Sequence, residues 1–204
     1  MNNSKDKTHN LERIYLNRES VDEMENMILI GRHLERYAFV RQYLWGNVVD
    51  IASGVGYGSH LIAKNPDISH VHGVDINEES VEWALTNFAS ERITFSLDSV
   101  ERFSGKFDFL VSLETIEHLE NPTSLYDLAL RCEVKEIILS FPGKKTTHYN
   151  RYHKWDILPS DVSDLFKEFV CINTMTHYDS IFMHLIHHVQ SRTPQKLWRE
   201  ASQN

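Results

Sequence analysis

Residues 48–59 of the chain read Val48-Val49-Asp50-Ile51-Ala52-Ser53-Gly54-Val55-Gly56-Tyr57-Gly58-Ser59. An apolar strand is predicted to end here at an acidic residue, three alternate glycines follow, and a helix is predicted to begin near Ser59. Glycine is needed where the backbone turns with a positive φ, or approaches a ligand without a Cβ in the way. The first N–H groups of such a helix are free to face that ligand. The stretch therefore predicts a nucleotide-binding loop, and we expect a branched side chain at Gly56 to block the ligand.

The spacing of the glycines and the neighbouring charges narrow the choice of nucleotide. A dinucleotide fingerprint reads G-x-G-x-x-G/A, whereas this chain has Ser59 at the last position. Asp50 at the strand tip would repel a pyrophosphate, but it suits a ligand that carries an ammonium and a sulfonium group. Asp75 ends the next apolar strand, 21 residues after Gly54, where such sheets place the acceptor for the ribose hydroxyls. S-adenosylmethionine has both positive charges and no phosphate, so it is favoured over a nicotinamide dinucleotide.

Across residues 33–190 the chain resembles the class I S-adenosylmethionine-dependent methyltransferases. Residues 50–58 match the first motif of that family, and Ser53 stands where many members have Cys, Gly or Ala. Residues 107–119, FDFLVSLETIEHL, are similar to its fourth-strand motif, F-D-x-V-x-x-x-x-V-x-E-H. The resemblance implies S-adenosylmethionine as cofactor. The cofactor-binding residues that it implies are Tyr37, Asp50, Ser53, Gly54, Gly56, Gly58, Asp75, Ile76, Asp98, Ser99 and Glu114.

The start of the matching region is similar to a narrower group. Residues 33–40, taken with Gly56-Tyr57-Gly58-Ser59, resemble small methyltransferases found with glycan and polysaccharide biosynthesis. This likeness implies a sugar as one possible acceptor. It also implies that Tyr37 and Arg36 lie over the methionine end of the cofactor. Ordinary helix packing is the alternative role for both side chains.

Strand and helix patterns alternate along the rest of the chain. The predicted strands are residues 47–51, 70–75, 93–97, 107–112 and 135–141, and the predicted helices are residues 58–64, 79–89, 122–131 and 160–167. Residues 168–176 and 180–190 are two strand-like runs with no helix between them, which predicts an antiparallel hairpin at the sheet edge. The chain is therefore expected to have an α/β, Rossmann-like doubly wound fold. The family resemblance implies a seven-stranded, mostly parallel sheet.

We expect one methyltransferase domain that spans residues 1–204. Residues 1–10 are polar and are predicted to be disordered. Residues 11–45 are expected to form an N-terminal helical cap, made of a short helix with a loop over residues 11–31 and a second helix over residues 32–45. The polar tail, residues 191–204, has no regular pattern.

Composition excludes several classes of function. The net charge of −8 disfavours a nucleic-acid partner, because nucleic-acid binders usually present a basic face. Two cysteines are too few for a disulfide framework and suit a reducing compartment. No apolar run reaches membrane-spanning length, and the first residues lack a signal-peptide core. We therefore expect a cytoplasmic protein that acts on a small-molecule acceptor.

Three segments are expected to meet at the carboxyl ends of the strands. They are the glycine loop, residues 112–118, and the long polar and aromatic segment of residues 141–155. Methyl transfer to a hydroxyl requires a base, and histidine suits that role at neutral pH. The candidate catalytic bases are His118, His153 and His148. Alternatively, His118 is a helix-start histidine that packs under the cofactor, and His148 and His153 are exposed loop residues.

Glu114, Glu117 and His118 also share the spacing of a metal motif, i, i+3, i+4. With His148 or His153 they could hold Mg²⁺ or Mn²⁺. Small-RNA 2′-O-methyltransferases have a similar ExxEH and a distant histidine. Because many metal-free methyltransferases share this motif, we expect no metal and no effect of a chelator. The leading hypothesis is methyl transfer to a hydroxyl or amine of a small molecule. The alternatives are metal-dependent RNA 2′-O-methylation and a cofactor-binding scaffold without activity.

Overall fold

A computed structural model describes residues 17–188 of the chain. The chain divides into two compact units, residues 1–35 and residues 36–204. Of the first unit, the structure describes mainly the beginning of helix α1 (Arg18–Val40). The side chain of Asn17 starts this helix, because its Oδ1 accepts a hydrogen bond from the backbone N–H of Ser20 at 2.8 Å. The predicted disorder of residues 1–10 and the tail of residues 191–204 lie outside the described residues.

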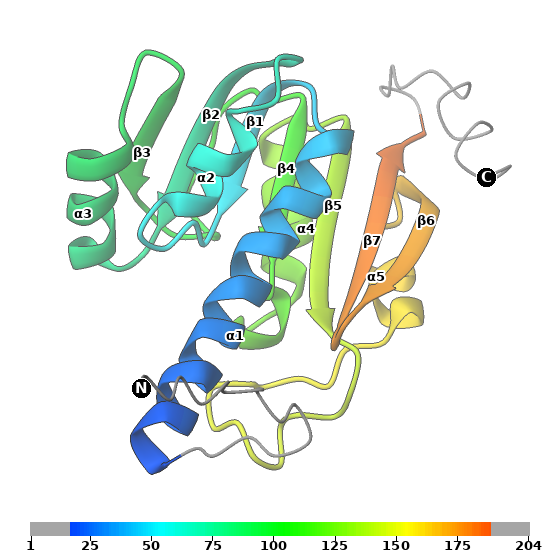
Figure 1. The fold of residues 1–204 in the computed structure, drawn as a ribbon. Coiled ribbons are helices and arrows are strands. Elements are labelled where there is room, and N and C mark those ends of the chain that lie inside the picture. Colours follow the sequence, from blue (N-terminus) through cyan, green and yellow to red (C-terminus); the bar gives the residue numbers. More distant parts are fainter. Residues whose placement is uncertain (1–16, 189–204) are drawn as a thin grey trace, which may run out of the picture. The chain divides into compact units, whose positions relative to one another are not determined.

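Seven strands of the described chain form one sheet, in the order β3-β2-β1-β4-β5-β7-β6 (Figure 1). The strands are β1 (Gly46–Ile51), β2 (Ile68–Asp75), β3 (Ile93–Leu97), β4 (Phe109–Leu113), β5 (Glu136–Pro142), β6 (Phe169–His177) and β7 (Ser180–His187). The pairs from β3 to β5 are parallel, whereas β7 runs antiparallel to both β5 and β6. The predicted α/β, Rossmann-like fold with an antiparallel edge hairpin is therefore confirmed.

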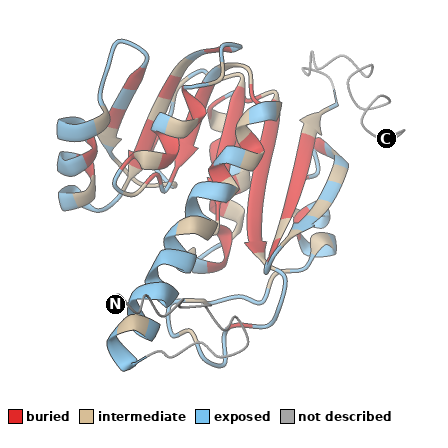
Figure 2. Ribbon diagram, viewed as in Figure 1, coloured by how far each residue is buried: buried red, intermediate tan, exposed pale blue. Residues whose placement is uncertain are grey.

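Helices cover both faces of this sheet and create two apolar cores. Besides α1, they are α2 (Tyr57–Ile62), α3 (Glu78–Phe88), α4 (Thr123–Arg131) and α5 (Pro159–Leu165), with 3₁₀ turns η1 (Arg41–Tyr43) and η2 (Ile116–His118). One core contains side chains of α2, α3 and the end of α1, and the other contains side chains of α4 and α5. Val48 and Val49 are both fully buried because they face opposite cores. Figure 2 shows the central strands buried and the outer helix surfaces exposed.

The N-terminal helix differs from the prediction of two segments divided near residue 31. A single helix runs through Gly31, since one glycine costs a helix only about 1 kcal/mol. The helix also ends earlier than the predicted residue 45, at Val40, and continues as the η1 turn. The amide of Asn65 fixes this end, because its Nδ2 donates to the carbonyl oxygens of Arg41 at 2.6 Å and Leu44 at 2.9 Å.

The register of the parallel strands brings their carboxyl ends to one edge. Asp50 of β1 lies beside Gly73 of β2 and Val111 of β4. Leu113 at the end of β4 lies beside Ser140 of β5. Ligands of open α/β sheets bind outside this edge. The loops that follow β1, β2, β4 and β5 therefore define the region in which to look for a site.

Candidate active site

The glycine loop leaves β1 through a tight turn at the carboxyl edge. Ala52 has φ 59°, Gly54 has φ +54° and Gly56 has φ +89°. A Cβ at Gly54 would meet no atom within 4 Å, so the space beside this residue is open to a ligand. The other glycines serve packing: a Cβ at Gly56 would come within 2.8 Å of Ala84 and Phe95, and one at Gly58 would overlap the ring of Tyr37. The expectation that a side chain at Gly56 would enter the ligand's path is corrected, because it would strike the core instead.

Asp75 lies at the tip of β2 and braces this loop. Its Oδ2 accepts the backbone N–H of Gly54 at 2.7 Å, and its Oδ1 accepts that of Asn77 at 2.9 Å. Asp75 is only partly buried, and the neighbouring Ile76 is 74% exposed. The carboxylate therefore joins the tips of β1 and β2 while it keeps access to solvent. Each carboxylate oxygen has a further lone pair with which to accept a hydroxyl group.

A cavity of about 280 Å³ opens at these strand tips. It is lined by Ile51, Ala52, Val74, Asp75, Ile76, Asp98, Ser99, Val100, Glu101, Thr115, His118, Leu119 and Glu120. Four of the predicted cofactor-binding residues, Asp75, Ile76, Asp98 and Ser99, thus come together. The lining contains four carboxylates and no Lys or Arg. Apolar walls with acidic groups fit a nucleoside that carries positive charge, and they do not fit a pyrophosphate.

Asp50 is placed beneath the loop and not on its open side. Its carboxylate is fully buried and accepts hydrogen bonds from Ser59 Oγ at 2.7 Å and from Tyr37 Oη at 3.3 Å. Burial raises the pKa of Asp50 from 3.8 to about 7, although the two hydroxyl groups act in the opposite direction. Asp50 therefore ties α1 and α2 to the end of β1. The Oγ of Ser53 is also buried and has no hydrogen-bond partner among the described residues.

Glu114 follows β4 with a strained backbone, φ +53°. Its Oε1 accepts a hydrogen bond from Ser140 Oγ at 2.7 Å, and its Oε2 lies 3.9 Å from Arg36 Nη2. The same guanidinium group lies 3.5 Å from Asp179 and donates from Nε to Ser180 Oγ at 3.1 Å. This network joins the ends of β4 and β5 to the β6–β7 turn. The sequence indicated Arg36 and Glu114, but no pattern indicated Ser140, Asp179 or Ser180.

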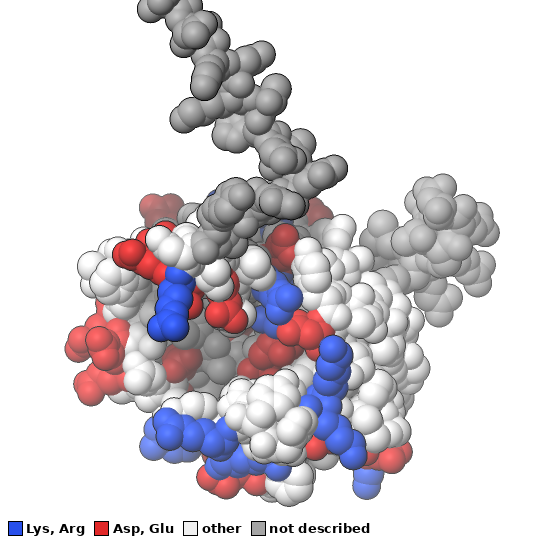
Figure 3. All heavy atoms as spheres, turned by 60° about the horizontal axis from the view of Figure 1, so that its bottom comes forward, with Lys and Arg blue, Asp and Glu red and all other residues white. Residues whose placement is uncertain are grey.

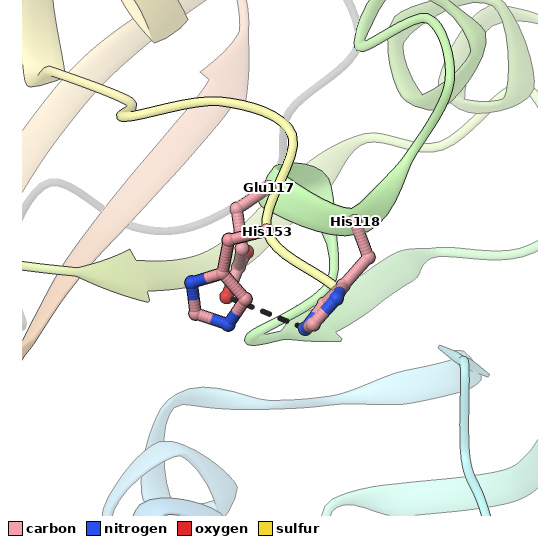
Figure 4. A group of neighbouring side chains, drawn as sticks. All are labelled: Glu117, His118 and His153. Carbon is pink, nitrogen blue, oxygen red and sulfur yellow. Dashed lines mark ion pairs between the residues drawn. The ribbon is translucent and has the colours of Figure 1, made fainter. Parts of the chain in front are cut away.

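Glu117, His118 and His153 form a second cluster, in which the candidate ligand atoms all lie within 4.8 Å of one another. Figure 4 shows the two imidazole rings and the carboxyl group side by side. The rings meet edge to face with centroids 4.6 Å apart, and His118 Nε2 lies 4.0 Å from Glu117 Oε1. The backbone N–H of Lys154 donates to the carbonyl oxygen of Glu117 at 2.8 Å. This bond holds the loop after β5 against η2, so residues 35 positions apart in sequence become neighbours.

The loop residues that orient the two imidazole rings were not indicated by the sequence. His118 Nδ1 lies 3.1 Å from the carbonyl oxygen of Tyr152, and His153 Nδ1 lies 2.5 Å from Thr146 Oγ1. Burial lowers the pKa of His153, which favours its neutral form. Burial and the nearby Glu114 carboxylate raise the pKa of Glu117 to about 8. The cluster thus contains two groups, Glu117 and His153, whose pKa values are shifted by burial, as is common at functional sites.

His148, the third candidate base, does not join this cluster. Its side chain is exposed, and its ring meets the ring of Tyr149 with centroids 4.8 Å apart. The structure therefore brings two of the three candidate histidines together. His118 also lines the cavity at the strand tips, so the cavity and the cluster share one residue.

Acidic and basic side chains are mixed at the end of the molecule that holds these loops. Figure 3 shows acidic groups in and around a hollow on this face, with basic groups scattered between them and not gathered into one patch. Within residues 17–188, no helix combines the length and apolar character that a membrane span needs.

The comparisons with known proteins agree with this geometry. A family model described as a methyltransferase domain matches residues 46–195. No curated protein sequence matches the chain. Magnesium protoporphyrin IX methyltransferase from Synechocystis PCC 6803, solved with bound S-adenosylmethionine, is 22% identical with a TM-score of 0.64, and the match covers 86% of each chain.

A second solved structure is similar over much of the chain. The N-methyltransferase NodS from Bradyrhizobium japonicum WM9, in complex with S-adenosylhomocysteine, is 13% identical with a TM-score of 0.62. The match covers 77% of this chain and 85% of that one. At such identities the likeness of these two structures concerns the fold, whereas the family model concerns the sequence itself.

Proposed function

The chain belongs to the methyltransferase domain family, and on that premise we propose that it transfers a methyl group to a hydroxyl group of a small molecule. As an S-adenosylmethionine-dependent methyltransferase it has an activated donor, since the sulfonium group supplies a methyl group that needs no further activation. The acceptor hydroxyl, in contrast, must lose its proton. The observation that carries the proposal is the shared position of His118, which lines the cavity and belongs to the cluster with Glu117 and His153.

We assign the cofactor to the cavity at the tips of β1, β2 and β3. Asp75 would accept the ribose hydroxyls, and Asp98 with Ser99 would hold the adenine end. The methionine end would lie beside Gly54, where the backbone leaves open space. Arg36 and Glu114, which lie 3.9 Å apart, would complete that end, and Tyr37 would support it from beneath the loop through Asp50. The acidic lining and the absence of Lys and Arg from it support this assignment.

The acceptor would lie between the cofactor cavity and the loop after β5. There the cluster of Glu117, His118 and His153 is in place to remove the hydroxyl proton. His148 has no part in this proposal because it is exposed and outside the cluster. A sugar hydroxyl is the acceptor that the sequence likeness suggests, and the mixed charges of this face support a neutral or zwitterionic small molecule over RNA. We further propose a cytoplasmic location, which the free thiols of Cys132 and Cys171 support.

An acceptor panel tests this function. Purified protein is incubated with methyl-labelled S-adenosylmethionine and three groups of compounds: sugars and nucleotide sugars, small amines, and RNA oligonucleotides with free 3′ ends. We expect label on an oxygen atom of a small molecule. Transfer to an amine or to RNA would replace the proposed acceptor class. Cofactor binding without transfer to any member of the panel would favour the scaffold hypothesis.

A further inference from the structure

The two imidazole rings of the cluster are oriented as in a metal site. The carbonyl oxygen of Tyr152 can only accept a hydrogen bond, so Nδ1 of His118 must carry the proton in that contact, and Nε2 is left with a lone pair. His153 Nδ1 contacts Thr146 Oγ1, a hydroxyl that can donate or accept, and when it accepts from Nδ1 the Nε2 of His153 is left with a second lone pair. Metal-binding histidines are commonly fixed through the other ring nitrogen in this way.

Glu117 adds a buried carboxylate that has no hydrogen-bond partner. Its side chain is 1% exposed, and neither oxygen accepts a hydrogen bond from any other residue that the structure describes. The ionised form of a buried, unpaired carboxyl group costs several kcal/mol, so it requires a counter-charge close by. The neighbouring polar atoms are ring nitrogens of His118 and His153, and a nitrogen lone pair there disfavours the negative charge further. A cation between these three side chains would remove both penalties.

We propose that Glu117, His118 and His153 form a site for a divalent transition-metal cation. Two imidazole nitrogens and one carboxylate oxygen suit ions such as Mn²⁺, Co²⁺ or Zn²⁺ better than Mg²⁺, which prefers oxygen ligands. Such an ion holds its ligands at about 2.0–2.2 Å, so neighbouring ligand atoms around it are roughly 3–3.6 Å apart. The three candidate atoms lie within 4.8 Å of one another, so the side chains would have to approach by about 1 Å to enclose an ion. Three protein ligands leave positions free for an acceptor.

This donor set differs from the one that the sequence suggested. The motif spacing included Glu114, but that carboxylate is held by Ser140 and Arg36 and stays outside the cluster. The sequence-based expectation of a metal-free site rested on the motif alone. The position of His153, brought in by the loop after β5, is the observation that changes our expectation.

A cation at this position would explain how the proton of an acceptor hydroxyl leaves at neutral pH, because a bound cation lowers the pKa of oxygen ligands. With the ion bound, the proton would pass to solvent, and the imidazole groups would serve the proposed deprotonation as ligands of the ion in place of acting directly as bases. This role rests on the proposed function, whereas the presence of the site does not.

Metal binding is measured first, on the full chain without an affinity tag. The metal-free protein is titrated with Mn²⁺, and the free ion is measured by electron paramagnetic resonance. We expect one Mn²⁺ ion bound per chain and its release when Zn²⁺ is added. We expect His153→Ala and Glu117→Gln to weaken Mn²⁺ binding at least tenfold. His148→Ala, an exposed histidine of the same loop, should leave it unchanged. Thermal unfolding of each variant shows whether it is folded.

Absence of Mn²⁺ and Zn²⁺ binding to the folded wild-type chain would overturn the site, as would equal affinity in the folded His153→Ala variant. The catalytic role of the ion is tested separately: a chelator is added to the transfer assay with the acceptor that the panel identifies. Loss of transfer, restored by Mn²⁺, supports it, and undiminished transfer refutes it while leaving the proposed function intact. Metal binding together with transfer to an amine would refute the proposed acceptor but not the site.

Discussion

Asp50→Asn tests the place that the structure gives to the first acid of the glycine loop. The pKa of this buried carboxyl group is about 7 in the folded chain, against an ordinary value of 3.8 for an aspartate in water. At Asp50 the folded state therefore binds more protons than the unfolded state between these two values, and the contribution of this group to stability falls as pH rises from 4 to 7. At 1.36 kcal/mol per unit, the loss amounts to about 4 kcal/mol.

The asparagine variant keeps the shape of the side chain but cannot ionise. Its oxygen and amide can still bond to the hydroxyl groups of Ser59 and Tyr37. We therefore expect equal stability of the two proteins near pH 4 and an advantage of up to about 4 kcal/mol for the variant at pH 8.

Urea unfolding of the cofactor-free wild type and Asp50→Asn at four pH values measures this effect. At each pH the free energy of unfolding of one protein is subtracted from that of the other. If the stabilities of the wild type and the variant changed in parallel with pH, the raised pKa of the buried Asp50 carboxyl group would be refuted. A titration with S-adenosylmethionine adds the functional test, because a carboxylate beneath the loop predicts little change in affinity and a direct contact with the ammonium group predicts a large one.

Gly58→Ala should lower the free energy of unfolding by about 1–3 kcal/mol, because its Cβ would overlap the ring of Tyr37; thermal unfolding measures the loss, and an unchanged midpoint would show that the ring moves freely. His153→Ala should reduce turnover by roughly 10²–10⁴-fold with little change in cofactor affinity, since the ring belongs to the acceptor cluster and does not line the cofactor cavity. His148→Ala should change neither quantity. A similar loss of turnover in both variants would contradict the different roles given to His153 and His148.

The fold could be predicted because its signals are local. The glycine loop and the apolar runs each report on a few neighbouring residues, and alternation of strands and helices leaves few possible arrangements. The edge hairpin followed from the absence of a helix between residues 168–176 and 180–190. The end of α1 could not be predicted, because the η1 turn that follows it is held by the amide of Asn65, more than twenty residues away.

The candidate site was predicted in its parts but not in its assembly. Asp75 and Asp98 follow strands, so their meeting at one edge could be expected. The choice of His153 over His148 could not be predicted from the sequence. Both residues lie in one polar loop, and only the fold of that loop decides which ring reaches His118. Likewise, Asp50 has the same sequence signal whether it faces a ligand or a buried pair of hydroxyl groups.

Calorimetric titration with S-adenosylmethionine of the wild type, Asp75→Ala and Glu101→Ala tests the central claim, that the cofactor binds in the cavity with its ribose on Asp75. Glu101 lines the same cavity and is a matched control for loss of an acidic group. Because Asp75 also braces Gly54, thermal unfolding must show that the variant is folded. We predict that Asp75→Ala weakens binding by about 1–3 kcal/mol, or roughly 5- to 150-fold, and that Glu101→Ala retains nearly full affinity. Equal affinity of the wild type and a folded Asp75→Ala variant would contradict the account.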